Sequence, residues 1–191
     1  MNNTFLTIDE RAFLLDLARQ AIMVKLATGQ ELGPDEEDEQ GGLALQAGAF
    51  VSLHGGGCLR GCIGTFVSDR PIAQTVAELA ISAAFCDPRF PPLTERELSG
   101  LKIEISVLSP LKRISSVDEI EVGTHGIYII KGQSRGVLLP QVATEQNWDR
   151  DTFLGHTCLK AGLPGDCWRG DAEIYTFTAE IFGEGESCHS A

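Results

Sequence analysis

A run of three glycines between two apolar segments is the feature of this sequence that most constrains its fold. The segments are Phe50–Leu53 and Leu59–Phe66, and residues 54–57 (His-Gly-Gly-Gly) lie between them. Short apolar segments on either side of a glycine-rich turn predict a β-hairpin. Side chains alternate between the two faces of a strand. Leu59, Ile63 and Thr65 would therefore face a core, and Phe66 would lie on the opposite face.

The second strand of this hairpin would place an arginine and a thiol on one face. Arg60 and Cys62 are two residues apart, so their side chains project to the same side. A fixed positive charge beside a thiol lowers the thiol's pKa and makes it a better nucleophile. We therefore predict Cys62 as a nucleophile with Arg60 as the activating cation. Gly61 and Gly64 would leave room for a bulge, a second backbone or a ligand. Alternatively, Cys62 is a small core residue, because free cysteine is often buried, and Arg60 is solvated.

The composition excludes several classes of protein. The chain has 191 residues and a formal net charge of −12. We find no cluster of lysine and arginine, which disfavours nucleic-acid binding. No segment reaches the roughly 18 apolar residues needed to span a bilayer, and residues 1–8 do not resemble a secretory signal. The six cysteines lack C-x-x-C spacing, which favours reduced thiols over a disulfide framework and predicts a cytoplasmic location.

The rest of the chain alternates helices and strands without a regular βαβ order. Helical spacing of apolar residues predicts helices over about 10–28, 71–86 and 148–160. Strand patterns cover 102–108 and 174–182, and a second hairpin joins 126–130 to 136–139. The acidic stretch 33–42 predicts a loop, and 183–191 a frayed tail. We therefore predict an α+β fold, with a mostly antiparallel sheet flanked by helices, in one domain that can form two unequal lobes.

Four further residues are candidates for a site around Cys62. Asp87 and Arg89 lie in a proline-rich loop, where they either pair with each other or leave Arg89 free to bind an anionic substrate. His125, at the start of a strand, and Glu145, before a helix, are candidate partners for a cysteine nucleophile. The alternative for both is a structural role, which for Glu145 would be to cap the helix.

The sequence favours neither a metal nor a bound cofactor. His54, Cys58 and Cys62 have loose spacing for zinc, and no second ligand pair accompanies them. There is no glycine-rich strand-to-helix loop of the kind that binds nucleotide phosphates. We take Cys188 and His189 as incidental residues of the tail.

The hexapeptide Leu59–Gly64 (LRGCIG) resembles the signature of the AMMECR-one domain family. Further motifs of that family are matched, in order, over 87–92, 104–110, 125–127, 138–143, Glu145 with Trp148, and 153–164. The resemblance thus covers nearly the whole chain, although the family's biochemical activity is unsettled. Its prokaryotic members are similar to component A of a three-part system. The resemblance therefore implies a Memo-like protein and a radical-SAM protein as partners.

Two hypotheses for function follow, and the sequence leaves open whether the chain is an enzyme. In the first, Cys62 acts on a small substrate with Arg60, His125 and Glu145, while Gly61, Gly64, Asp87 and Arg89 line the substrate site. In the second, the hexapeptide is a structural element of an interaction module that binds the Memo-like or radical-SAM partner.

Overall fold

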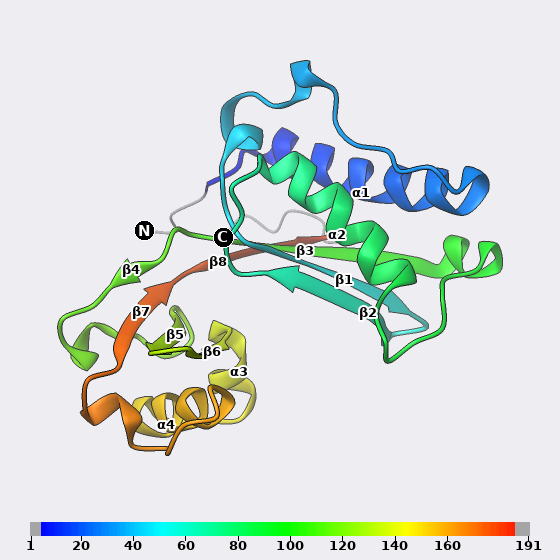
Figure 1. The fold of residues 1–191 in the computed structure, drawn as a ribbon. Helices are drawn as coiled ribbons and strands as arrows, with labels where there is room; N and C mark the ends of the chain where they lie inside the picture. The colour runs from blue at the N-terminus through cyan, green and yellow to red at the C-terminus, as the bar shows by residue number, and fades with distance from the viewer. Residues whose placement is uncertain (1–4, 186–191) are drawn as a thin grey trace. The chain divides into compact units, whose positions relative to one another are not determined.

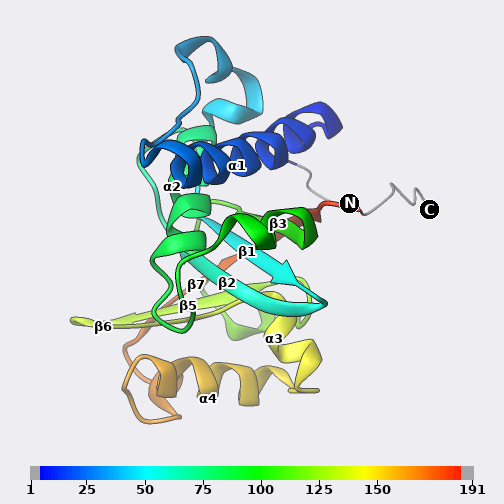
Figure 2. The same ribbon diagram turned by 90° about the vertical axis from the view of Figure 1, so that its right-hand side faces the viewer.

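A computed structural model describes residues 5–185 of the chain, which divides into two compact units. One unit comprises Met1–Leu108 with Glu180–Ala191, and the other comprises Ser109–Ala179. Each unit is built on one four-stranded sheet with helices beside it (Figures 1 and 2). The sheets are largely antiparallel, which confirms the predicted α+β class.

The sheet of the first unit has the order β2-β1-β3-β8, with β2 at one edge. Its strands are β1 (Ala49–Gly55), β2 (Cys58–Thr65), β3 (Leu101–Leu108) and β8 (Ala179–Gly183). Alternate side chains of β1 and β3 are fully buried and form the core. The others belong to a second face, on which cross-strand neighbours from β1 and β3 lie side by side.

Two helices cover the core face of this sheet. Helix α1 (Ile8–Thr28) begins with a capping box formed by Thr7 and Glu10. Helix α2 (Ile72–Phe85) begins after Pro71 and packs against α1, β1 and β2. Both helices are drawn above the sheet in Figure 1. Because the buried face of α2 is rich in alanine, the helix packs close to β1 and β2. This close packing limits the space around the hexapeptide Leu59–Gly64.

The first hairpin departs from its predicted register. The turn is Gly56-Gly57, with φ of 59° and 82°, a left-handed pair that glycine adopts without strain. Leu53 pairs with Gly61 but His54 pairs with Leu59, so Arg60 is the extra residue of a β-bulge. The bulge breaks the alternation, and Leu59 is 40% exposed instead of facing the core.

The second unit carries a sheet of order β4-β7-β5-β6. Its strands are β4 (Lys112–Arg113), β5 (Gly126–Lys131), β6 (Ser134–Leu138) and β7 (Glu173–Phe177). The predicted second hairpin is confirmed as β5–β6. The predicted strand over 174–182 is wrong as one strand, because β7 and β8 belong to different sheets.

Helices α3 (Pro140–Glu145) and α4 (Arg150–Lys160) belong to this unit, and α4 packs on β5 and β6. Asp149 caps α4 by accepting a hydrogen bond from the Thr152 amide. Short 3-10 helices cover Glu36–Asp38, Gly41–Ala44, Glu95–Gly100, Val117–Glu119 and Cys167–Arg169. Within residues 5–185, none of the helices has both the length and the apolar character to cross a bilayer.

The first residues of the predicted frayed tail are ordered in the structure, since Gly183 ends β8 and Glu184 forms an ion pair with Arg19. The predicted tail residues Cys188 and His189 lie outside the described part of the chain.

Two of the cysteines also differ from the prediction. Cys158 and Cys167 form a disulfide, so the expectation that all six cysteines are reduced is wrong for this pair.

Candidate functional site

The predicted loop around Asp87 lies along the open edge of strand β2. The amide of Cys62 donates to Asp87 Oδ2 at 2.9 Å, and Arg89 Nη2 donates to the Cys62 carbonyl at 3.2 Å. An edge strand exposes unpaired backbone groups that can recruit another chain. Asp87 and Arg89 satisfy both groups of Cys62 instead, and we call this pair of contacts the clamp.

The clamp depends on an ion pair with two parallel contacts. Arg89 Nε and Nη2 lie 2.9 and 2.7 Å from the two carboxylate oxygens of Asp87. The side chain of Asp87 is 2% exposed and that of Arg89 55%. The hydrogen bond from Arg89, followed by the amides of Cys62 and Arg89, lowers the pKa of Asp87 far below its usual range despite desolvation. Of the two predicted alternatives, Asp87 and Arg89 therefore pair with each other.

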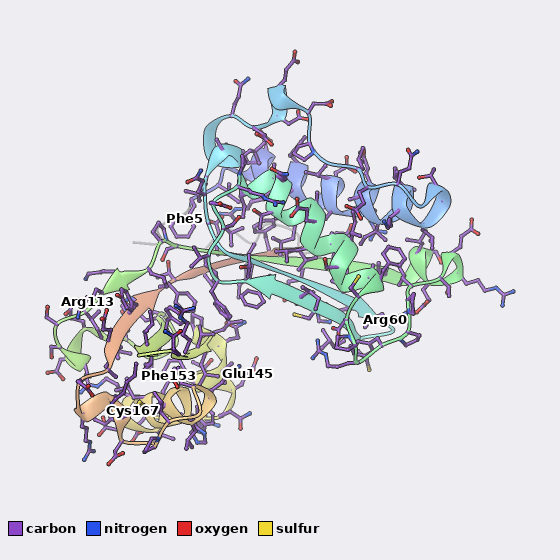
Figure 3. All side chains as sticks on the ribbon, viewed as in Figure 1. Phe5, Arg60, Arg113, Glu145, Phe153 and Cys167 are labelled. Atoms are coloured by element: carbon purple, nitrogen blue, oxygen red, sulfur yellow. A yellow bond between two sulfur atoms is a disulfide. The ribbon has the colours of Figure 1, made fainter. Side chains whose placement is uncertain are left out.

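Arg60 is held by a different carboxylate. Its Nε lies 2.6 Å from Glu97 Oε1, and its Nη2 donates to the Pro91 carbonyl at 2.9 Å. The arginine, followed by the hydroxyl and amide of Thr94, lowers the pKa of Glu97 from 4.5 to about 2. The Arg60 side chain is only 14% exposed. Figure 3 labels Arg60 beside the loop that leads from α2 to β3.

Phe90 contacts both arginines through its ring. The guanidinium carbons of Arg60 and Arg89 are 5.8 and 5.5 Å from the centre of its ring. Cation–π contacts at this distance are favourable. Phe90 therefore joins the two ion pairs into one cluster.

The two glycines of the hexapeptide allow close packing. A Cβ atom at Gly61 would lie 2.2 Å from the Ala83 carbonyl oxygen of α2, and one at Gly64 would lie 2.1 Å from the Phe50 ring. Real Cβ atoms do not come this close to other heavy atoms. At Gly61 the backbone of α2 makes the close approach that was one of the predicted alternatives, whereas at Gly64 the space holds the Phe50 ring.

The thiol of Cys62 is half-buried and has a hydroxyl neighbour. Ser52, directly opposite on β1, donates from Oγ to Cys62 Sγ at 3.3 Å. Arg89 donates to the backbone carbonyl of Cys62, and its pKa is raised first by Asp87 and further by Cys62. The interactions of Arg60 go to Glu97, Pro91 and Phe90. Activation of the thiol by Arg60 stays a prediction.

His125 and Glu145 belong to the second unit. The Nδ1 atom of His125 accepts from the Glu121 amide at 3.0 Å, and its own amide donates to the Glu121 carbonyl, which closes the turn before β5. Glu145 is exposed at the end of α3 (Figure 3) and does not cap α4, which Asp149 does. Their proposed action on Cys62 stays a prediction.

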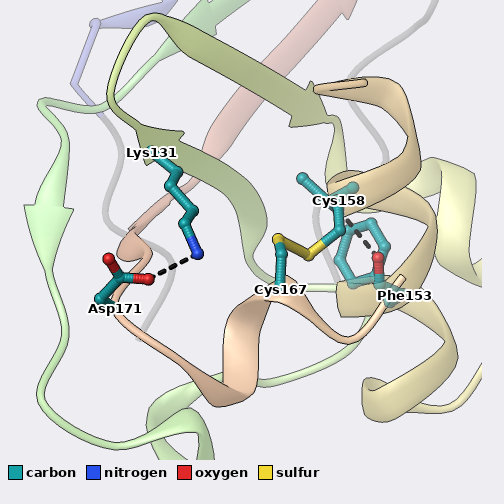
Figure 4. The surroundings of a disulfide bond; sticks show 6 residues. Lys131, Phe153, Cys158, Cys167 and Asp171 are labelled. Carbon is teal, nitrogen blue, oxygen red and sulfur yellow. Dashed lines mark hydrogen bonds and ion pairs between the residues drawn. A yellow bond between two sulfur atoms is a disulfide. The ribbon is translucent and has the colours of Figure 1, made fainter. Parts of the chain in front are cut away.

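The disulfide is the feature that the sequence analysis missed. It joins Cys158 of α4 to Cys167, nine residues later, with the Cα atoms 6.0 Å apart (Figure 4). Both cysteines are buried in the core of the second unit, near the ion pair of Lys131 with Asp171. The sequence does contain a pattern that indicates this disulfide. Cys158 lies on the apolar face of a predicted helix, and a turn over Gly162–Pro164 brings the following residues back toward that face.

Two residues of the Cys62 surroundings were also missed, since neither Glu97 nor Ser52 was singled out as a candidate. The strand register, once known, would have placed Ser52 opposite Cys62. In the described part of the chain, no three metal-ligating side chains converge on one point. The zinc alternative at His54, Cys58 and Cys62 thus gains no support.

Comparisons with known proteins relate this chain to a family and to a solved structure. The AMMECR1 family profile matches residues 15–182. Protein MK0488 of Methanopyrus kandleri is 44% identical over 191 residues, which cover 95% of this chain and 91% of that protein. A protein of Methanosarcina acetivorans is 41% identical and covers 95% of this chain and 94% of its own length. The crystal structure of the uncharacterized protein PH0010 from Pyrococcus horikoshii matches with a TM-score of 0.84 at 40% identity, covering 95% of both chains.

Proposed function

The chain belongs to the AMMECR1 family, and on that premise we propose that it acts as a binding component and not as a thiol catalyst. In this proposal the hexapeptide Leu59–Gly64 is a structural element that fixes the edge of the first sheet. The partners would be the Memo-like and radical-SAM proteins that the family resemblance implies.

The observation that carries the proposal is that both arginines around Cys62 are already paired with carboxylates. Arg60 is paired with Glu97, and Arg89 is paired with Asp87. A guanidinium beside its own carboxylate acts on a third group as a dipole, whose field falls off faster with distance than that of a net charge. Electrostatic activation of the Cys62 thiol requires a cation that is not neutralised in this way.

The contacts of the hexapeptide also support a structural role. Arg60 binds the loop, Gly61 admits α2, the backbone of Cys62 is clamped, Ile63 packs into the core and Gly64 admits the Phe50 ring. Five of six residues are thus used by the fold itself. Leu59, the sixth, is exposed and available to a partner.

The experiment is to measure binding of this chain to the purified Memo-like and radical-SAM proteins of the same genome. Wild type, Cys62→Ala and the matched control Cys86→Ala are compared by analytical size-exclusion chromatography and calorimetry. The proposal expects all three to bind with equal affinity, because the clamp uses the backbone of Cys62 and not its sulfur. If the wild-type chain binds neither of the two proteins, the proposal is contradicted.

A cysteine-dependent enzyme is the second candidate, and one observation favours it. The Ser52 hydroxyl donates to the Cys62 sulfur, and a donated hydrogen bond stabilises a thiolate. The thiol is also only half-buried. If Cys62→Ala abolished the pathway function of the chain while partner binding stayed intact, this candidate would replace the first.

A further inference from the structure

A polar pocket of about 260 Å³ lies on the second face of the first unit's sheet, apart from the clamp. The side chains of His54, Lys102, Glu104 and Glu184 line it. Backbone atoms of β3 and the end of β8 complete it, since Ile103, Gly183 and Gly185 are the other lining residues. All of these residues belong to one unit, so the pocket is formed by the first unit alone.

The strand register brings three of these side chains together. His54 on β1 pairs with Lys102 on β3, and Ser52 pairs with Glu104. Lys102 and Glu104 are two residues apart on one strand and project from the same face. The row from Ser52 to Glu104 is continued on β2 by Cys62, which also pairs with Ser52.

Of the charged groups here, one carboxylate is already used. Glu184 accepts two hydrogen bonds from Arg19 of α1 and one from the Ile103 amide. It therefore closes the end of the sheet and offers no free charge to a ligand. The side chains of Lys102 and Glu104, in contrast, take part in none of the side-chain hydrogen bonds or ion pairs found in residues 5–185, and they do not pair with each other.

His54 contributes to the wall of the pocket. Its Nε2 atom is buried and has no hydrogen-bond partner within the described part of the chain. An atom that is closed to water is equally closed to a ligand in the pocket, so the polar contacts to a ligand come from Lys102 and Glu104.

We propose that this pocket binds a small zwitterion of the α-amino acid type, with its carboxylate on Lys102 and its ammonium on Glu104. One free cation and one free carboxylate complement such a molecule, whereas a simple anion or cation would leave one charge unpaired. The Lys102 ammonium lies 3.7 Å from where a Cβ would stand at Gly185, which places it at the β8 side of the pocket. This inference does not depend on the partners proposed above.

The glycine at 183 offers a variant that fills the pocket without changing its charge. A Cβ there would lie 3.7 Å from Cβ of Glu104 and 3.4 Å from the Ile103 carbonyl oxygen, at ordinary contact distances. The backbone of Gly183 is not in the left-handed region. A valine at this position is therefore accommodated by the backbone, while its methyl groups occupy ligand space.

The test is NMR titration of the ¹⁵N-labelled chain with L-alanine and with its two halves, propionate and ethylamine. We expect L-alanine to shift the amides of Ile103, Gly183 and Gly185 and the ring signals of His54 in a saturable manner. Each half lacks one charged contact, so each should bind at least about tenfold more weakly. Absence of saturable shifts with L-alanine, or equal binding by either half, overturns the proposal.

Variants separate this pocket from a nonspecific surface effect. Lys102→Met, Glu104→Gln and Gly183→Val should each weaken L-alanine binding by at least about tenfold. Lys160→Met and Glu95→Gln change exposed residues of the same types away from the pocket and should bind as wild type does. Circular dichroism of each variant verifies its fold. If the three pocket variants bind as wild type does while folded, the site is elsewhere and the inference is wrong.

Discussion

Replacing Gly61 by alanine tests whether the hexapeptide is a structural element. Gly61 lies where α2 crosses the edge strand, and its missing side chain leaves just enough room for the Ala83 carbonyl. The added methyl group has no free space to enter. We therefore expect Gly61→Ala to destabilise the first unit, although alanine is the smallest substitution available.

The magnitude follows from the geometry of that contact. The new Cβ would stand 2.2 Å from the carbonyl oxygen, while real Cβ atoms stay beyond 3.0 Å. Helix α2 and strand β2 must therefore separate by about 1 Å, and overpacking of this kind costs about 1–3 kcal/mol. Because the oxygen belongs to the backbone and the position of the Cβ is fixed by the backbone of residue 61, no side-chain rotation relieves the clash, so we expect about 3 kcal/mol. For a chain of this length, that lowers Tm by about 6–12 °C.

The assay is urea unfolding and thermal unfolding followed by circular dichroism. Gly100→Ala is the matched control, because a Cβ at Gly100 meets nothing within 4 Å and its φ is not in the left-handed region. The control should stay within about 0.5 kcal/mol of wild type. If Gly61→Ala unfolds at the same urea concentration and the same temperature as Gly100→Ala, the close packing of α2 on the hexapeptide is refuted.

Three further predictions concern the disulfide, the Arg60 ion pair and the clamp. Replacing Cys158 and Cys167 by alanine removes a disulfide that closes a loop over a separation of nine residues. We expect the free energy of unfolding of the second unit to fall by about 3 kcal/mol. An unchanged midpoint in urea unfolding would show that the disulfide is not formed. The lowered pKa of Glu97 means that its ion pair with Arg60 stabilises the fold above the ordinary pKa of 4.5 and is lost as the pH falls toward about 2. Wild type should therefore lose its stability advantage over Glu97→Gln across this window, and a constant difference in unfolding free energy would show that the pair is not formed. Asp87→Ala removes both the charge that holds Arg89 and the acceptor of the Cys62 amide; we expect a loss of about 2–4 kcal/mol and faster hydrogen exchange of that amide, and unchanged exchange measured by NMR would refute the clamp.

The elements of the fold were largely predictable because each carries its own local signal. The capping box of Thr7 and Glu10, the proline at position 71 and the alternation over 102–108 each mark an element where the structure has one. A bulge was one of the alternatives that Gly61 and Gly64 allowed, but its position at Arg60 was not predictable, because it depends on the pairing of β2 with β1 and on the room that α2 leaves. One extra residue was enough to turn Leu59 out of the core.

The charge pattern around Cys62 shows the same limit. The sequence placed Asp87 and Arg89 near each other, and their pairing was one of the two alternatives stated. It could not show that Glu97, 37 positions after Arg60, would pair with that arginine. Long-range contacts of this kind are set by tertiary packing, which a single sequence does not encode in its local spacing. The split between β7 and β8 escaped prediction for the same reason, since their apolar pattern runs on unbroken.

The rate at which the free thiols react with iodoacetamide at neutral pH tests the central claim most directly. Cys58 and Cys86 are exposed free thiols of the same chain and serve as internal references for half-buried Cys62. Peptide mass spectrometry gives the rate for each position. Neutralised arginines and partial burial predict that Cys62 reacts more slowly than both references. A rate for Cys62 more than about tenfold above theirs would require an activated thiolate and would contradict the account.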